Sequence, residues 1–507
     1  MSVPQDNKRI AKNTLFLYFR QILIMAISLY TSRLVLKELG VEDFGIYNVI
    51  GGFVALLSVI SGSLSAAMSR FYTFELGLND IGRLKRVFST SISVLLILAI
   101  VIFIIGELAG KWALNDFLVI PETRLNTAFV VLQASIIAFV FNLLSSPFSG
   151  AIIAYEKMQA FAYLGIADAF GRLLIALCLQ LAVNDKLVMF SILQTLLSLI
   201  ILGIYIIYCK FNLKGCTLRF KLDKEIFYSL SKYATWSMLG MMSYVSYTYG
   251  YNIILNIFFG PIVNAARGIS VQVQNAIVSF ANNFQASLNP QIIKNYANGN
   301  FDRMHELVLA SSRYSFYMML LIALPLILEA DAVLDLWLVE IPPHAVNFVR
   351  IFLFSMCIEV LAGPMICSQN ATGDIKKFQI VTSVIMLCSL PVCYWAFEMG
   401  LSPEYLYWIH ALSAIVSQIA RITITCPYIG ISIQKYIKEV IVKILLVSLV
   451  SIPLPLVLYV ILRNVPFQLF IITIVGAVSV LLSTYFVGMN GGERMVAKNK
   501  ILSYYNK

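Results

Sequence analysis

Apolar residues run along this chain in stretches of spanning length, separated by short polar or basic gaps. A helix that crosses a bilayer needs about 20 consecutive, mostly apolar residues. We therefore predict an all-α integral membrane protein with about fourteen spanning helices and no external domain, because every gap on the outer side is short. The expected spans cover residues 14–36, 44–68, 88–109, 125–149, 162–183, 188–208, 233–258, 268–289, 314–330, 346–368, 378–398, 405–426, 439–462 and 467–488.

Composition supports this pattern. Apolar residues make up 60% of the chain and charged residues 12%, against about 45–50% and about 25% in soluble proteins. The net charge of +11 would suggest nucleic acid as a partner in a soluble protein. In a chain with so many apolar stretches it reflects orientation instead. The balance excludes a soluble enzyme, a disordered chain and a nucleic-acid-binding domain.

The placement of Lys and Arg predicts the orientation. With the N-terminus in the cytoplasm, 25 of these residues fall in cytoplasmic gaps and 6 in opposite gaps. Such a bias is the signature of the positive-inside rule. We expect both termini in the cytoplasm. The basic N-terminus leads into an apolar stretch without a small-residue cleavage site, so we expect an uncleaved first span.

The second half of the chain repeats the first. Residues 39–88 align without a gap with residues 259–308, and Gly40 then meets Gly260. Six spans per copy give both copies one orientation, so we expect two lobes related by an axis along the membrane normal. The basic segment that links the two lobes is either a plain positive-inside loop or a surface helix that binds anionic lipid headgroups. The expected parts are an N-terminal lobe (1–210), a basic cytoplasmic linker (211–232), a C-terminal lobe (233–426) and two further spans with a cytoplasmic tail (427–507).

One face of the eighth span is polar. Asn275, Ser279, Asn282 and Asn289 follow one another at helical spacing, and the repeat-related face of the second span is small or polar. Two interpretations remain open, namely close helix packing with interhelical hydrogen bonds or the lining of a watery cavity. On the second interpretation Asn275 and Asn282 contact substrate.

Charged residues at membrane depth are costly and mark candidate sites. Asp168 and Arg172 lie one turn apart in the fifth span, either as a neutral intrahelical pair or with Arg172 facing a cavity. Arg20 either extends to the cytoplasmic surface or lines the cavity. Glu359 has no charge one turn away along its helix and is either protonated and structural or a proton or cation site.

The embedded charge is mostly cationic. We count eight embedded cations against two embedded carboxylates, Asp168 and Glu359, and guanidinium groups suit phosphate. Tyr244, Tyr247 and Tyr251 share one face of the seventh span, either as a structural aromatic stripe or as a surface for sugar rings. The embedded cations are Arg20, Arg33, Arg70, Arg172, Arg267, Arg350, Arg421 and Lys443; of these, Arg33, Arg267 and Arg350 lie near outer ends and join Arg20 and Arg172 as candidate substrate contacts.

No catalytic, nucleotide-binding or metal-binding motif appears in the sequence. The three histidines are far apart, and none of the eight cysteines forms a C-x-x-C pair. A disulfide framework or zinc site is not expected. We predict neither an enzyme nor a resident cofactor or metal.

The stretches NKRIAKNTLFLYFRQ, SRLVLKELGVEDFGIYNV, FNLLSSPFSGAIIAYEKMQAF and FFGPIVNAARGISVQVQ resemble those of Wzx-type O-antigen and capsule flippases. These belong to the multidrug/oligosaccharidyl-lipid/polysaccharide exporter superfamily. The resemblance implies a MATE-like fold with a V-shaped cleft between two bundles, in a bacterial inner membrane. It implies an undecaprenyl-pyrophosphate-linked oligosaccharide as cargo. Arg20 and Arg33 then match functional arginines of the first span, and only Asp168 and Glu359 remain for Na⁺ or H⁺ coupling.

The sequence therefore predicts a monomeric flippase working beside polysaccharide polymerases and other assembly proteins. The pyrophosphate pairs with cleft arginines, the glycan lies on polar faces of the second, seventh and eighth spans, and the lobes rock to expose the cargo. One rival is a multidrug/cation antiporter of the same superfamily. Another is a membrane-embedded glycan polymerase or ligase, which needs acid and base residues on a sizeable outer loop.

Overall fold

The computed structural model describes residues 3–55, 58–112, 114, 121–181, 185–216, 220–338, 341–462, 465 and 467–495. Helices make up nearly all of these residues, and no strand occurs within the described ranges. The prediction of an all-α membrane protein is confirmed.

The chain divides into two compact units. Unit 1 comprises Met1–Met241 and Ile293–Gly299, and unit 2 comprises Met242–Ile292 and Asn300–Lys507. Helix α7 runs through both, so its middle belongs to unit 2 and its two ends to unit 1. The two additional C-terminal spans cluster with unit 2.

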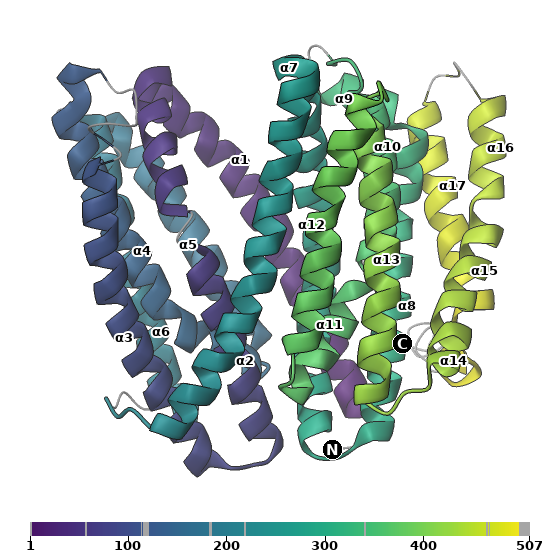
Figure 1. The fold of residues 1–507 in the computed structure, drawn as a ribbon, viewed down its shortest axis with the longest axis horizontal. Helices are drawn as coiled ribbons and strands as arrows, with labels where there is room; N and C mark the ends of the chain where they lie inside the picture. The colour runs from purple at the N-terminus through teal and green to yellow at the C-terminus, as the bar shows by residue number, and fades with distance from the viewer. Residues whose placement is uncertain are drawn as a thin grey trace, which may run out of the picture. The chain divides into compact units, whose positions relative to one another are not determined.

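Unit 1 is a bundle in which α4 packs against α2, α3 and α6, while α1 packs along α5 (Figure 1). One of its apolar cores gathers side chains from α1, α4, α5 and α6. Its elements are α1 (Val3–Ala55), α2 (Ser58–Gly77), α3 (Ile81–Trp112), η2 (Glu122–Arg124), α4 (Leu125–Ala154), α5 (Met158–Cys178), η3 (Leu179–Leu181) and α6 (Lys186–Asn212), with the ends of α7 (Lys224–Ala297).

Unit 2 is a bundle in which α13 packs against α10, α11 and α12, while α8 packs against α10 and α17 (Figure 1). Its elements are α8 (Phe301–Leu328), α9 (Ala330–Trp337), α10 (Ala345–Glu359), α11 (Ala362–Thr372), α12 (Lys376–Glu398), α13 (Tyr405–Tyr428), α14 (Ile433–Tyr436), η4 (Ile437–Ile441), α15 (Val442–Ser451), α16 (Pro453–Ile461), α17 (Gln468–Ser483) and η5 (Thr484–Gly488).

Eleven helices in the described part of the chain are long and apolar enough to cross a membrane. They correspond to eleven of the fourteen expected spans. The other three, 44–68, 233–258 and 268–289, lie in α1, α2 and α7. Two of these are rich in amide, hydroxyl and tyrosine side chains, and the first is interrupted by residues outside the described ranges. Their polarity indicates that they face protein or water more than lipid.

Repeat-related residues adopt the same backbone geometry. Gly40 breaks α1 with φ 77° and ψ 171°, and Gly260 breaks α7 with φ 75° and ψ −171°. Asn79 and its mate Gly299 both have positive φ. Each glycine break turns the chain from one expected span into the next, in a region of backbone space that essentially only glycine occupies.

One close contact joins repeat-related residues inside unit 1. A Cβ placed on Gly77, at the end of α2, would lie 2.8 Å from the Cβ of Ala297, at the end of α7. The absence of a side chain at Gly77 therefore permits the two helix ends to approach closely. The alignment of residues 39–88 with residues 259–308 has an offset of 220 residues, so Gly77 is aligned with Ala297.

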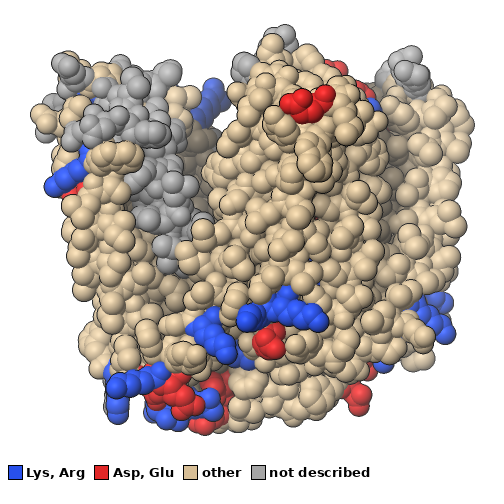
Figure 2. Space-filling model, viewed as in Figure 1, with Lys and Arg blue, Asp and Glu red and all other residues tan. Residues whose placement is uncertain are grey.

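Charged side chains are unevenly spread over the surface. On the face shown in Figure 2, Lys, Arg, Asp and Glu gather mainly towards the lower end of the view, and most of the surface above is uncharged. Large apolar side chains are exposed on many helices, among them Leu108, Leu174, Ile200 and Leu449. An exposed apolar surface of this kind fits a chain that lies in lipid.

Candidate functional site

A row of tyrosines on α7 forms one wall of a buried site in unit 2. The rings of Tyr244, Tyr247 and Tyr251 meet edge to face in sequence, each pair with centroids 5.4 Å apart. His410 of α13 stacks on Tyr247 with an interplanar angle of 18°. Tyr247 and Tyr251 are buried, whereas Tyr244 remains 47% exposed. Tyr247 and Tyr251 therefore pack as a structural aromatic stripe, whereas Tyr244 keeps an exposed ring that is available to a ligand.

Arg267 lies beside this row, almost fully buried. One of its terminal nitrogens donates to the Thr248 carbonyl oxygen at 3.0 Å, and the guanidinium lies 5.9 Å from the Tyr251 ring centroid. Its Nε is buried and has no hydrogen-bond partner among the described residues. A buried donor without a partner is unfavourable, so this guanidinium retains capacity to bind an acceptor.

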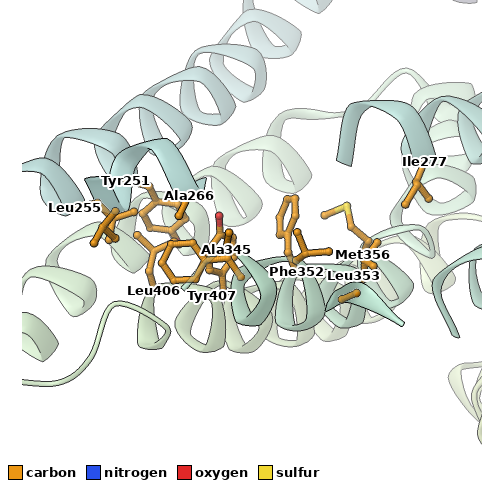
Figure 3. Close-up of a cluster of buried hydrophobic side chains, with 14 of the residues drawn as sticks. Tyr251, Leu255, Ala266, Ile277, Ala345, Phe352, Leu353, Met356, Leu406 and Tyr407 are labelled. Atoms are coloured by element: carbon orange, nitrogen blue, oxygen red, sulfur yellow. The ribbon is translucent and has the colours of Figure 1, made fainter. Parts of the chain in front are cut away.

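A small cavity of about 20 Å³ opens at Arg267. Aromatic rings dominate its lining, and no carboxylate occurs among the described residues that line it. Figure 3 shows the adjoining core, where Tyr251 of α7, Phe352 of α10 and Tyr407 of α13 lie close together. The full lining is Tyr244, Tyr247, Thr248, Tyr251, Arg267, Val271, Gln274, Phe352, Leu406, Tyr407 and His410.

A second cavity adjoins the first through the shared Tyr247 and His410. Glu359 Oε1 lies 3.3 Å from His410 Nε2, and Ser413, Ser417 and Arg421 also line the cavity. The room available, about 10 Å³, suits one water molecule. Two basic side chains, His410 and Arg421, therefore share a small cavity with one partly buried carboxylate.

Glu359 lies where the tenth span is interrupted. Helix α10 ends at Glu359, and α11 begins at Ala362. The carbonyl oxygens freed by the break accept hydrogen bonds from amide side chains, Val360 from Gln285 at 2.9 Å and Leu361 from Gln418 at 3.4 Å. Broken helices at membrane depth are typical of binding sites in transporters.

Unit 1 holds a smaller charged cluster. Arg172 Nε donates to Asp168 Oδ2 at 3.1 Å within α5, so the predicted intrahelical pair is present. The Arg20 guanidinium of α1 lies 4.5 Å from the Phe161 ring centroid. Its Nε is buried without a hydrogen-bond partner among the described residues. This cluster therefore carries two guanidiniums against one carboxylate.

The remaining sequence-predicted residues lie apart from these clusters. Arg350 donates to the Ile327 carbonyl oxygen at 3.0 Å and pairs with Asp331 at 2.7 Å, so it ties α10 to the end of α8 and the start of α9. Arg33 is exposed on α1. Asn275 and Asn282 are exposed on α7, and neither lines the two cavities.

Two other basic residues, Lys443 and Arg313, pair with nearby carboxylates. Lys443 pairs with Glu439 one turn earlier at 2.9 Å. Arg313, on the buried side of α8, pairs with Glu493 at 2.7 Å and lies 3.7 Å from Glu439. Glu439 and Glu493 thus neutralise part of the positive charge of Lys443 and Arg313.

Sequence reasoning missed His410, Tyr407 and the helix-capping amides. No sequence motif surrounds His410. A helical-face pattern would have found it, since His410, Ser417 and Arg421 repeat on one side of α13. No group of three or more His, Cys, Asp or Glu side chains suited to a metal ion occurs in the described ranges.

Comparisons with known proteins agree on the fold. A family model described as MatE matches residues 17–177. A crystal structure of a mutant MATE protein has a TM-score of 0.73 at 13% identity, with 84% of this chain and 97% of that chain covered. An outward-facing multidrug resistance MATE family transporter of the MOP superfamily has a TM-score of 0.71 at 12% identity, with the same coverage of 84% and 97%.

A third solved structure is a MOP superfamily transporter from Pyrococcus furiosus. It is described as having a binding pocket of reverse polarity that suggests a different function, and it has a TM-score of 0.69 at 12% identity over 83% of this chain and 96% of that chain. No curated protein matches the chain. Identities this low show the fold alone. The chain has the fold of MATE transporters, and part of its N-terminal half matches the MatE family.

Proposed function

We propose that this protein is a flippase. It moves an undecaprenyl-pyrophosphate-linked oligosaccharide from the cytoplasmic to the periplasmic leaflet of a bacterial inner membrane by alternating access. The cargo serves the synthesis of a cell-surface polysaccharide such as O-antigen, capsule or exopolysaccharide. The MATE transporter fold and the resemblance of the sequence to Wzx-type flippases support a transporter of this class.

The observation that carries the proposal is Arg267. A guanidinium that is buried among aromatic rings, with an unused donor and no lining carboxylate, attracts an anion and repels a cation. Guanidinium groups bind phosphate with two parallel hydrogen bonds. A site for cationic drugs favours the opposite charge, with carboxylates beside the rings. The chemistry of this cavity therefore favours a phosphate-bearing cargo over a cationic one.

Tyr244 supplies a surface for the glycan in this proposal. Its ring is 47% exposed and is supported from behind by Tyr247. A rigid aromatic face next to a phosphate-binding group is suited to a sugar attached to that phosphate. Arg20 and Arg172 provide further positive charge in unit 1, while Arg33, Asn275 and Asn282 stay candidates for contact along the pathway.

The coupling ion of this proposal is Na⁺ or H⁺, with Glu359 or Asp168 as the coupling carboxylate. Glu359 is favoured by its position at a break in the tenth span and by its contact with His410. Arg421 lines the same cavity and opposes a metal cation there. We therefore place H⁺ ahead of Na⁺, acting on the pair of Glu359 and His410.

The second candidate function is a multidrug/cation antiporter, which the description of one solved structure with this fold, a multidrug resistance MATE family transporter, favours. Its specific support in this chain is the Glu359 carboxylate in a buried cavity. The flippase would carry an anionic cargo and the antiporter a cationic one.

In our proposal the flippase acts as a monomer beside the polymerase and other assembly proteins, and it catalyses no chemical step.

Deletion of the gene tests the proposal. We expect a lipid-linked glycan to accumulate on the cytoplasmic side and surface polysaccharide to disappear, with restoration by the wild-type chain and not by Arg267→Ala. Mass spectrometry of extracted lipids identifies the accumulated species. Unchanged surface glycan together with increased sensitivity to cationic dyes would establish the antiporter instead.

A further inference from the structure

Two residues of α5 fit around the Arg20 side chain in unit 1. Phe161 places its ring centroid 4.5 Å from the Arg20 Cζ. Gly165, one turn further along the same helix, faces the guanidinium edge, and a Cβ placed there would lie 2.5 Å from Arg20 Nε and 3.0 Å from its Nη2. Real Cβ atoms essentially never approach another heavy atom so closely. Arg20 therefore occupies the space that any other residue at position 165 would fill.

This arrangement differs from ordinary glycine packing in the chain. Gly110 and Gly171 also face close neighbours, but these are the methyl groups of Leu132 and Leu197. Such glycines let apolar helices pack closely. Gly165 instead makes room for a charged group inside a membrane-spanning helix bundle, where a cation is costly to hold.

The surroundings leave the Arg20 charge available to a ligand. Asp168 and Tyr205 lie within electrostatic range, but Asp168 already accepts a hydrogen bond from Arg172. Arg20 Nε has no hydrogen-bond partner in the described part of the chain. The guanidinium thus lies between the Phe161 ring and the space left by the missing side chain of Gly165. Its Nε–H is free to donate a hydrogen bond to a ligand.

We propose that Phe161 and Gly165 form a seat that positions the Arg20 guanidinium for the phosphate group of the cargo. Gly165 is a positioning residue, because it acts through Arg20 and not by contact with the ligand. The identity of the anion rests on the proposed function, whereas the seat rests on the geometry of α1 and α5. Phe161 fixes the guanidinium plane by its ring face, which attracts a cation.

The seat is tested first without any cargo. Phenylglyoxal modifies accessible guanidinium groups, and mass spectrometry of the full-length protein in detergent reports the rate at Arg20. We expect Gly165→Ala to raise this rate several-fold, since the added methyl group displaces the side chain. Phe161→Leu adds no bulk and is expected to change the rate in the same direction. Gly110→Ala is the matched control, because its Cβ would meet Leu132 at the same 2.5 Å.

The second readout measures binding of farnesyl diphosphate, with farnesol as the uncharged control. We expect Gly165→Ala to weaken diphosphate binding by about tenfold or more, as does loss of a buried charged contact, and Gly110→Ala to leave it unchanged. In an Arg20→Ala background, Gly165→Ala has no further effect if the glycine acts through the arginine.

The outcomes separate this inference from the proposed function. Unchanged phenylglyoxal reactivity in both Gly165→Ala and Phe161→Leu overturns the seat, whatever the cargo. Additive losses of binding in the double variant overturn the positioning role of Gly165. Equal binding of farnesyl diphosphate and farnesol by the wild-type chain overturns the anionic cargo, and the modification rates then still decide whether the seat exists.

Discussion

The two units share a backbone plan and differ in how they hold charge. Gly40 and Gly260 break their helices with nearly the same dihedral angles. In unit 1, however, Arg172 and Asp168 neutralise each other within one helix, with side chains that are 46% and 34% exposed. In unit 2, Arg267, His410 and Arg421 are each at least 95% buried.

This difference shows in which unit the protein holds charged side chains at a cost in folding free energy. An exposed pair on one helix turn costs little and contributes little. A buried guanidinium without a carboxylate partner is unfavourable in the free protein, and a structure keeps it only where something compensates. We infer that the buried arginines of unit 2 are the more specialised feature, whereas the exposed pair of Arg172 and Asp168 in unit 1 is adjustable.

Truncating the two arginines sharpens this comparison most. We expect Arg267→Ala to reduce glycan export by at least about tenfold, because losing a buried charged contact with cargo costs about 2–5 kcal/mol. Arg172→Ala is expected to reduce it less, since its half-exposed pair is worth about 0.2–1 kcal/mol. Surface glycan in a complemented deletion strain, normalised to the amount of inserted protein, gives the comparison. Equal losses contradict it.

A second large effect concerns the stability of unit 1. Lys294 Nζ pairs at 2.6 Å with Glu156, whose side chain is only 2% exposed. Lys294→Ala leaves this carboxylate buried without that cation, and we expect a loss of about 3–5 kcal/mol in the free energy of unfolding. Arg350→Ala, which removes an exposed pair with Asp331 in unit 2 and two hydrogen bonds to carbonyls, is expected to cost less.

Thermal unfolding in detergent measures the loss of stability in Lys294→Ala and in Arg350→Ala. The double variant Lys294→Ala with Glu156→Gln is expected to recover part of the loss, because a neutral amide tolerates burial better than a carboxylate. Absence of any recovery means that Lys294 stabilises unit 1 by packing and not by charge.

The two helix breaks test the shared plan. Gly40→Ala and Gly260→Ala are each expected to cost about 1–3 kcal/mol, because both glycines have dihedral angles that other residues rarely adopt. An added Cβ meets no neighbour at either position, so the penalty is confined to the backbone. Gly203→Ala and Gly268→Ala, in open helical positions, serve as controls and are expected to be neutral or slightly stabilising. Unequal penalties at the two breaks show that the repeats have diverged there.

The smallest effect is a pH dependence in unit 2. Burial raises the pKa of Glu404, but hydrogen bonds from His344, Ser402 and Asn347 outweigh it and hold this pKa below the usual value for a glutamate. A carboxyl group with a lowered pKa in the folded state stabilises the fold above its ordinary pKa and loses that contribution as pH falls. We expect the thermal stability to decline below about pH 4.5, and Glu404→Gln to flatten part of this decline.

Much of the fold was accessible from hydropathy alone. Eleven spans are strongly apolar, and the alignment that pairs Gly40 with Gly260 pointed to a repeat, although the breaks at these glycines appear only in the structure. The spans in α2 and α7 were recognisable only by continuity with the others, since their polar side chains weaken the signal. The pattern of charged residues between the spans gave no indication that Arg313 pairs with Glu439 and Glu493. This pairing depends on how α8 packs against the last two spans.

The candidate site was only partly accessible. Charge at membrane depth pointed to Arg267, Asp168, Arg172 and Glu359 directly. The contact between Glu359 and His410 joins residues 51 positions apart, and no local pattern encodes it. The distinction between Tyr244 and its two buried neighbours also needs the packing of α13, because periodicity identifies a shared face but not its exposure.

The meeting of Gly77 with Ala297 bears on how such a chain arose. If a shorter ancestor paired with a copy of itself, the residue on the dyad would have touched its own counterpart, and one amino acid had to serve both sides. Fusion of two copies removes that constraint. Here Ala297 carries a methyl group and Gly77 has none, an asymmetry that a homodimer encoded by a single gene was never free to adopt.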